Sequence, residues 1–137
     1  MQKTLLLLFL FLFVETTNAQ QHILSDDSQI SVLTIGPGTS LNDSFGHNAF
    51  RVKDNIKGTD LVFNYGVYDF ETPNFYTKFA QGKLNYLIGL NYYDDFFESY
   101  ISQNRTIKEQ VLNLSASDKQ KLFDYLLNNI KPENRAY

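Results

Sequence analysis

The chain has 137 residues, a formal net charge of −3 at pH 7 and no cysteine. The absence of cysteine excludes disulfides and thiolate metal sites, so burial of apolar surface must stabilise any folded domain. The 12 lysines and arginines form no cluster that could follow a phosphate backbone, which argues against nucleic acid as a partner. With only two histidines and none of the usual metal-ligand spacings, we expect no metal or other cofactor.

The first residues have the pattern of a secretory signal peptide, which we place at residues 1–19. Lys3 supplies a positive charge, residues 5–14 form an unbroken apolar run, and residues 17–19 offer a cleavage site. As a helix the apolar run would be about 15 Å long, roughly half of the hydrocarbon thickness that a membrane-spanning helix must cross. We therefore expect an exported protein. An uncleaved anchor that extends to Ala19 is the alternative.

Residues 20–137 are predicted to form one domain, and its first half is predicted to be strands. The β-branched run at residues 30–35 indicates a strand that stops at the Gly-Pro-Gly of residues 36–38. Residues 48–53 alternate in polarity, residues 61–65 form a compact apolar run, and turn residues lie between them. This pattern predicts a β-hairpin.

The second half of the domain mixes helices and strands. Thr72 and Pro73 indicate a helix start, and Gly82 is placed to end that helix. We then expect a strand at residues 84–92, a helix at residues 94–102 and an extended segment at residues 105–114. Ser115 and Asp118 form a capping box before a last helix, which Pro132 closes. Because no regular βαβ repeat is visible, the order favours an α+β fold.

His47 is the candidate general base. It lies between Gly46 and a predicted strand, and an imidazole titrates near neutrality and can relay protons. Its usual thiol partner is absent, and a surface or hydrogen-bonding role is the alternative. The other histidine, His22, lies in the polar segment near the predicted cleavage site, where we expect a solvated side chain.

Two residues beside His47 have a functional and a structural interpretation. Ser44 could form a Ser-His relay, but the chain has no GxSxG elbow around it, and loop capping is the favoured role. Gly46 could let the backbone approach a substrate closely, or it could only relieve a tight turn.

Three residues of the predicted hairpin are further candidates for binding. Arg51 either meets an anionic group or is solvated, and solvation is the default for an arginine. Asn64 and Tyr65 could present an amide and a phenol towards His47, whereas the alternative places Tyr65 in the core. A set of downstream aromatic residues could line an acyl-chain groove, although a core role is favoured: Tyr68, Phe70, Phe75, Tyr76 and Phe79.

Three blocks, in this order, resemble the Lnb N-terminal periplasmic domain family. They are residues 44–51 with their Gly-His pair, residues 60–66 with Asn-Tyr-Gly, and residues 73–79 with Pro-Asn-Phe-Tyr, and the resemblance covers Ser31 to Tyr137. It implies a circularly permuted papain-like fold of the NlpC/P60 type, with an antiparallel sheet and packed helices. The catalytic histidine of the family, which precedes the cysteine in sequence, matches His47.

The resemblance also implies a function, namely periplasmic lipoprotein N-acylation. A cysteine takes an acyl chain from phospholipid as a thioester and passes it to the amino group of a lipoprotein. We therefore expect a phospholipid donor, a lipoprotein acceptor and a membrane surface as partners. In the family the cysteine follows the segment that matches residues 132–137, in an Asn-Cys context.

Because the chain has no sulfur nucleophile, we expect it to be an inactive, incomplete front part of a longer acyltransferase-like protein, associated with the membrane through a missing C-terminal part. Two alternatives stay open. One is a cysteine peptidase or amidase of the same fold class. The other is an exported, non-catalytic module that binds lipid or protein.

Overall fold

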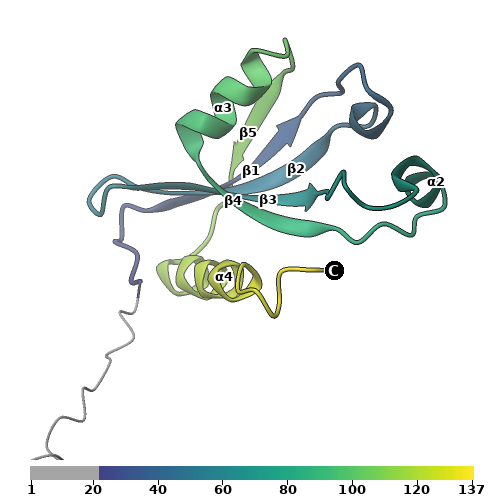
Figure 1. Cartoon of the computed structure of the whole chain (residues 1–137). Helices are drawn as coiled ribbons and strands as arrows, with labels where there is room; N and C mark the ends of the chain where they lie inside the picture. The colour runs from purple at the N-terminus through teal and green to yellow at the C-terminus, as the bar shows by residue number, and fades with distance from the viewer. Residues whose placement is uncertain (1–21) are drawn as a thin grey trace, which may run out of the picture.

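The computed structural model describes residues 22–137, so the predicted signal peptide lies outside the described residues. A five-stranded antiparallel sheet with the order β4-β3-β2-β1-β5 forms the centre of the domain (Figure 1). The strands are β1 (Gln29–Ile35), β2 (His47–Asp54), β3 (Thr59–Val67), β4 (Leu87–Tyr92) and β5 (Ile107–Val111). The helices are the 3-10 helix η1 (Leu41–Asp43) and the α-helices α2 (Phe75–Ala80), α3 (Tyr93–Ile101) and α4 (Ala116–Asn129). The predicted α+β class is confirmed, including the antiparallel sheet.

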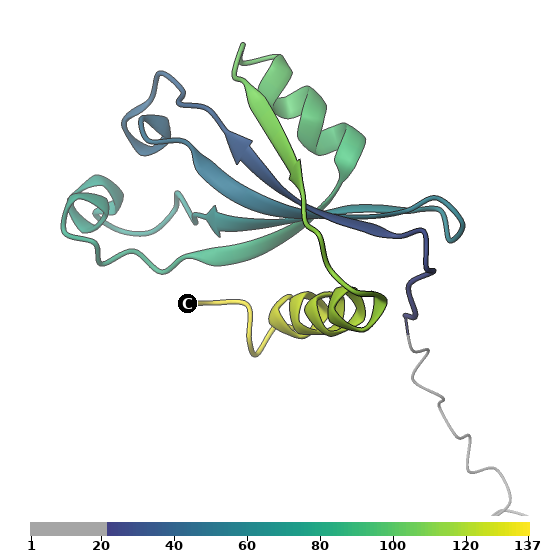
Figure 2. The ribbon, with the colours of Figure 1, turned by 180° about the vertical axis from the view of Figure 1, so that it is seen from behind.

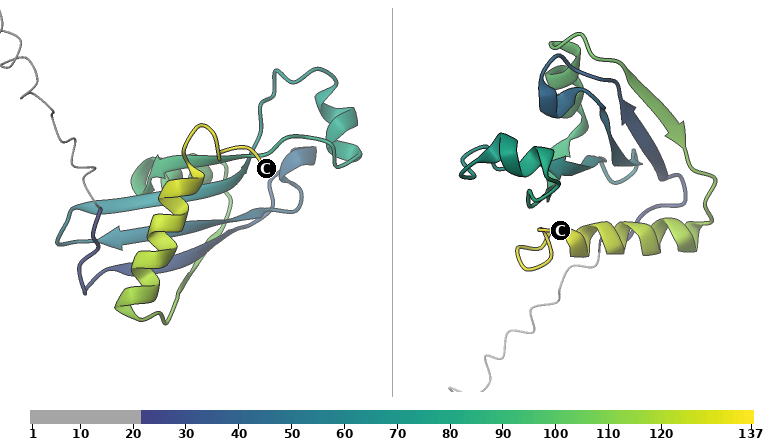
Figure 3. Two further views of the ribbon diagram at one scale, coloured as in Figure 1. Left: turned by 90° about the horizontal axis from the view of Figure 1, so that it is seen from below. Right: turned by 90° about the vertical axis from the view of Figure 1, so that its right-hand side faces the viewer.

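Each face of the sheet is covered by one helix. α3 lies against one face and α4 against the other, as both views of the ribbon show (Figures 1 and 2). We call these the α3 face and the α4 face. Seen from below, α4 crosses the strands rather than running along them (Figure 3). A separate layer of side chains therefore lies between each helix and the sheet.

The alternation of the strands sorts apolar residues onto both faces. On the α4 face, Phe63 packs edge-on against Phe123 with ring centroids 6.2 Å apart. The buried residues of this layer are Ile30, Val52, Phe63, Ile88, Phe123 and Leu126. Those of the α3 face are Leu33, Ile35, Ala49, Val62 and Phe96. β1, β2 and β3 contribute to both layers, so the centre of the sheet is buried on both sides.

The predicted hairpin of β2 and β3 is confirmed, with Phe50 opposite Phe63. Its turn is organised by Asp54, whose carboxylate accepts hydrogen bonds from the amides of Ile56 and Lys57, both at 3.1 Å. The amide and the hydroxyl of Ser25 also donate to Asp54, at 2.7 and 2.8 Å. Burial alone would raise the pKa of Asp54, but these four hydrogen bonds outweigh it and lower the pKa. Asp54 thus joins the turn to the segment before β1.

The ends of α4 follow the predicted pattern. The Ser115 hydroxyl accepts a hydrogen bond from the Asp118 amide at 3.1 Å and donates to the Asp118 carboxylate at 2.7 Å. This is the predicted N-terminal cap, which satisfies one of the free amides of the first turn. The helix ends at Asn129, before Pro132.

The predicted start of α2 at Thr72 was wrong. The Thr72 amide closes a turn onto the Asp69 carbonyl, and the N-cap is Asn74, in the left-handed conformation with φ 59°. Asparagine tolerates that conformation better than most residues, which explains the later start. Gly82, with φ 65°, ends the segment as predicted.

The aromatic residues around α2 form a cluster beside the sheet. Tyr68 is at its centre, with ring centroids 5.3 to 6.0 Å from those of Phe70, Phe75, Phe79 and Tyr86. The favoured core role holds for Phe75, which is buried. Phe70 and Tyr76 are instead 59% and 62% exposed, so part of this cluster faces solvent.

Candidate functional site

His47 is the first residue of β2, opposite Ile35 at the end of β1. The chain reaches this position through Gly46, which has φ +66°. A Cβ atom on Gly46 would collide with the carbonyl oxygen of Ile35. Gly46 therefore has a backbone role, because only glycine fits this close approach of the loop to β1.

The imidazole of His47 contacts Tyr100 of α3. The distance from Nε2 of His47 to the hydroxyl oxygen of Tyr100 is 3.1 Å, and the two ring centroids are 5.4 Å apart. Tyr100 is separated from Phe96 by one helical turn, and both rings face the sheet from α3. The predicted helix at residues 94–102 includes Tyr100, but no local sequence signal connects its hydroxyl to His47.

Arg105 supports this pair from the segment between α3 and β5. Its side chain is buried, and its Nε donates to the carbonyl of Gly36 at 2.9 Å. Its Nη1 lies 3.6 Å from the carboxylate of Asp43, and its Cζ lies 4.8 Å from the ring centroid of Tyr100. A guanidinium over an aromatic ring is a favourable cation–π arrangement. Arg105 thus connects the loop after β1 to the end of α3.

The electrostatics of the cluster keep His47 neutral to lower pH than usual. Burial, and after it the positive charge of Arg105, lower the pKa of His47 below its ordinary value of 6.5, against weaker opposing effects of Asn64 and Asp43. Burial raises the pKa of Tyr100, against opposing effects of Asn64 and Arg105. At neutral pH the pair is therefore an uncharged imidazole and an uncharged phenol. An uncharged imidazole can accept a proton.

The structure brings Asn64 to His47 but takes Tyr65 away from it. Asn64 lies on the α3 face opposite Ala49 and Gly89, and its buried Oδ1 has no hydrogen-bond partner among residues 22–137. Tyr65 follows Asn64 and therefore points to the α4 face, where its hydroxyl accepts a hydrogen bond from Asn129 at 3.0 Å. Successive residues of a strand cannot both face His47, so only half of the predicted pair is in position.

Ser44 has the loop-capping role that the sequence favoured. Its side chain is exposed, and its hydroxyl donates to the carbonyl of Ser40 at 3.0 Å. His22 is exposed as predicted, and its carbonyl accepts a hydrogen bond from Gln120 at 3.0 Å.

The predicted solvated role of Arg51 was wrong. Arg51 is buried on the α3 face and donates twice to Asp60, at 2.7 Å each, and twice to Glu109, at 3.1 and 3.2 Å. Its guanidinium also lies 3.3 Å from the ring centroid of Tyr93. The Arg51 guanidinium already contacts two carboxylates and an aromatic ring, so it is not free to bind an anionic substrate.

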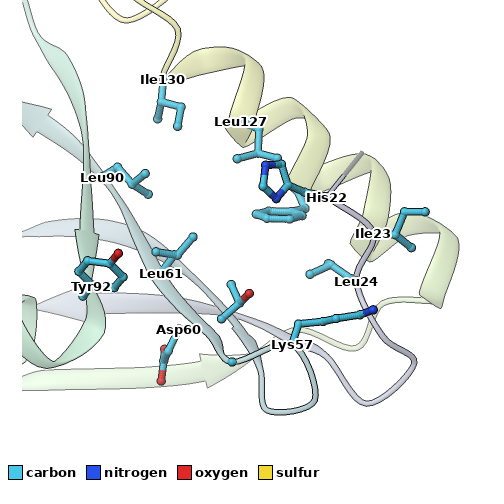
Figure 4. A pocket seen from close by; sticks show the side chains of 13 residues that line it. His22, Ile23, Leu24, Lys57, Asp60, Leu61, Leu90, Tyr92, Leu127 and Ile130 are labelled. Carbon is cyan, nitrogen blue, oxygen red and sulfur yellow. The ribbon is translucent and has the colours of Figure 1, made fainter. Parts of the chain in front are cut away.

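A cavity of about 690 Å³ lies away from His47, between α4 and the start of β3 (Figure 4). Aliphatic side chains of three elements line it: Leu61 of β3, Leu90 of β4, and Leu127 and Ile130 at the end of α4. It opens on the α4 face near the β2–β3 turn, whereas His47 lies at the opposite end of β2 on the α3 face. The cavity and the histidine are therefore separate features.

Two other kinds of site are absent from the part of the chain that the structure describes. No group of three or more histidine and acidic residues lies together so that it could hold a metal ion. No helix within residues 22–137 has the length and apolar character needed to cross a membrane.

Comparison with known proteins identifies the family. The sequence model of the Lnb N-terminal periplasmic domain matches residues 15–137. No curated protein and no solved structure gives a significant match. The family is periplasmic by its description, in agreement with the export that the N-terminal residues predict. Because the match spans far more than half of the sequence, the chain belongs to the Lnb N-terminal periplasmic domain family.

Proposed function

We propose that this domain supplies the histidine half of a periplasmic lipoprotein N-acyltransferase, with His47 as general base for a cysteine outside these 137 residues. The observation that carries the proposal is the environment of His47. The ring is half-buried, its pKa is lowered by burial and by Arg105, and it contacts a second polar side chain. A solvated surface histidine would have none of these features.

The proposed reaction has two acyl-transfer steps. In the first, the thiol gives its proton to His47, the thiolate attacks the ester carbonyl of a phospholipid, and the ester C–O bond breaks. The imidazolium returns the proton to the departing alcohol, which leaves as a lysophospholipid. In the second, the amino group of a lipoprotein attacks the thioester, the C–S bond breaks, and the amine proton returns to the thiolate through His47.

The C-terminal residues support a site shared between His47 and a later segment. Residues 135–137 pair with the start of β4: the Ile88 amide donates to the Arg135 carbonyl at 3.1 Å, and Tyr86 and Tyr137 exchange hydrogen bonds of 3.1 and 2.9 Å. This tail runs antiparallel to β4 and parallel to β3, so it heads towards the end of the sheet where His47 lies.

The distance to be covered is short. From β2 across β3 and β4 to the tail is three strand spacings, or about 14 Å. About five extended residues can span this distance. A longer polypeptide that continues from Tyr137 would therefore begin within reach of His47. This arrangement fits a permuted papain-like domain in which the cysteine follows the histidine.

Exposed apolar side chains at the same end support a lipid as the acyl donor. Phe45, two residues before His47, is 88% exposed, and Leu41 of η1 is also exposed. Phe70 and Tyr76 of the α2 region are exposed as well, and η1 and α2 project from the same end of the sheet (Figure 1). Aromatic and aliphatic side chains of this kind favour the interface of a bilayer. We propose contact with a membrane surface through these residues.

The first test is the reading frame beyond Tyr137. The proposal predicts a cysteine in an Asn-Cys context within a few dozen codons, and a stop codon directly after Tyr137 would contradict it for this gene. The longer polypeptide is then incubated with phospholipid and a lipopeptide that has a free N-terminal cysteine amine. Mass spectrometry should show the addition of one acyl chain to the lipopeptide.

Two histidine variants test whether His47 is the general base. His47→Ala should lower acyl transfer roughly a hundredfold or more, since it removes the proton acceptor. His22→Ala is the matched control and should leave the rate unchanged. A full rate in His47→Ala would contradict the proposal. Cleavage of cell-wall peptides without acyl transfer would instead identify a peptidase or amidase.

A further inference from the structure

We infer that Tyr100 is a positioning residue that holds the ring of His47 through Nε2 and leaves Nδ1 as the nitrogen that accepts the proton. The assignment of Nδ1 to a thiol rests on the proposed function. The contact between Tyr100 and Nε2 does not, and it can be tested in this chain alone.

One of the two ring nitrogens of His47 already has a hydrogen-bond partner. Nε2 of His47 lies 3.1 Å from the Tyr100 hydroxyl, and the rings meet at an interplanar angle of 56° with centroids 5.4 Å apart. A neutral imidazole carries one N–H and one free lone pair. If Nδ1 is to accept a proton, the N–H must be on Nε2 and must donate to the Tyr100 oxygen. A phenol can accept that hydrogen bond and still donate its own proton.

Tyr100 is itself held in place from three directions. Its ring packs against Phe96 with centroids 4.8 Å apart, and the Arg105 guanidinium lies over it at 4.8 Å. The Arg105 amide also donates to the Tyr100 carbonyl at 3.0 Å. Because Arg105 is fixed in turn on the Gly36 carbonyl, the hydroxyl has little freedom to move. A rigid partner of this kind is what a catalytic imidazole needs to keep one orientation.

Asn64 is the competing partner for the same ring. Its amide lies close enough to His47 and Tyr100 to affect the pKa of both, yet its Oδ1 makes no hydrogen bond to any described residue. The Tyr100 hydroxyl is the group that meets a His47 nitrogen at hydrogen-bond distance. We therefore assign the positioning role to Tyr100, and a variant of each residue separates the two.

The test uses the purified chain labelled with ¹⁵N-histidine. Long-range ¹H–¹⁵N spectra, recorded above the pKa of His47, identify which ring nitrogen carries the proton, and the exchange of that proton with water is measured. We expect the N–H on Nε2, with slow exchange. Tyr100→Phe keeps the ring but removes the acceptor, and it should speed exchange by at least about tenfold. Tyr93→Phe, the same change on the same helix away from His47, should have no effect.

Two results would overturn the inference. One is an N–H on Nδ1 in the unmodified chain. The other is slow exchange that survives Tyr100→Phe but is lost in Asn64→Leu, which would transfer the role to Asn64. Unchanged backbone amide spectra establish that each variant is folded.

An acyl-transfer assay of the longer polypeptide adds an independent readout. Tyr100→Phe should lower kcat about tenfold and leave KM unchanged, because it disturbs the base and not the binding of lipid. A change in KM alone would contradict the positioning role. If the longer polypeptide transfers no acyl group at all, the proposed function fails while the exchange measurement still decides the role of Tyr100.

Discussion

The two faces of the sheet differ in what they bury. The α4 face is an apolar layer centred on Phe63 and Phe123, with one buried carboxylate, Asp54, at the end of β2. The α3 face combines a smaller apolar layer with two buried arginines, Arg51 and Arg105, and with His47. Burying charged and polar groups is costly unless each finds partners, and an apolar replacement of similar size is often as stable. The α4 face therefore stabilises the fold mainly by apolar burial, whereas the α3 face combines burial with polar contacts and holds the candidate site.

The arginines on the α3 face act in the same way at the two ends of α3. The guanidinium of Arg51 lies over Tyr93 at the start of the helix, and that of Arg105 lies over Tyr100 near its end. Each arginine is anchored elsewhere, Arg51 on Asp60 and Glu109 and Arg105 on the Gly36 carbonyl. The helix that carries the partner of His47 is thus fixed to the sheet at both ends.

The largest effect on stability is expected on the α4 face. Phe63→Ala removes a fully buried ring that packs on Phe123, and it should lower the free energy of unfolding by about 4 kcal/mol. Phe70→Ala is the matched control, since that ring is largely exposed, and it should cost about 1 kcal/mol or less. Urea unfolding measures both. Equal losses would mean that the α4 face is not the main source of stability.

A smaller loss is expected for the ion pairs of the α3 face. Arg51→Leu should lower the free energy of unfolding by about 2 kcal/mol, less than for a fully buried pair, because the freed carboxylates are partly exposed and can regain water. Lys121→Leu removes an exposed ion pair to Asp118 and should leave the free energy of unfolding almost unchanged, because both charges stay in water. A loss in Arg51→Leu as small as in the control would show that this network does not fix α3.

The smallest effect is a pH dependence that comes from His47. Because its pKa in the folded state is lowered, the unfolded state binds more protons just below pH 6.5, and stability must rise with pH there. The contribution of neutral His47 to the free energy of unfolding is present above pH 6.5 and is lost as the pH falls through the lowered pKa of the folded state. Urea unfolding between pH 7.5 and 5 should therefore show a steeper decline in the unmodified chain than in His47→Gln. If stability declined equally steeply in both proteins, the His47 ring would be solvated in the folded state.

Local patterns predicted much of the fold because their causes are local. The β2–β3 hairpin follows from alternation and turn residues, and the start of α4 follows from Ser115 and Asp118 three residues apart. The candidate base was likewise visible, since His47 follows a glycine at a strand start. Strand alternation also predicts that Asn64 and Tyr65 face opposite sides of the sheet.

The rest depends on residues that are distant in sequence. Arg51 looked solvated because its second carboxylate, on Glu109, lies 58 residues away. Tyr100 is 53 residues from His47, and the Gly36 carbonyl that anchors Arg105 is 69 residues from it. No periodicity or capping rule encodes such contacts. They appear only when β1, β2 and α3 are packed together.

The role of His47 is tested most directly by an NMR titration of its ring in the purified chain. We expect a pKa below 6.5, because burial and the charge of Arg105 disfavour the imidazolium. In Arg105→Met, which removes that charge, the pKa of His47 should rise towards 6.5. A pKa at or above 6.5 in the unmodified chain would show a solvated histidine and would contradict the assignment of His47 as a preorganised base.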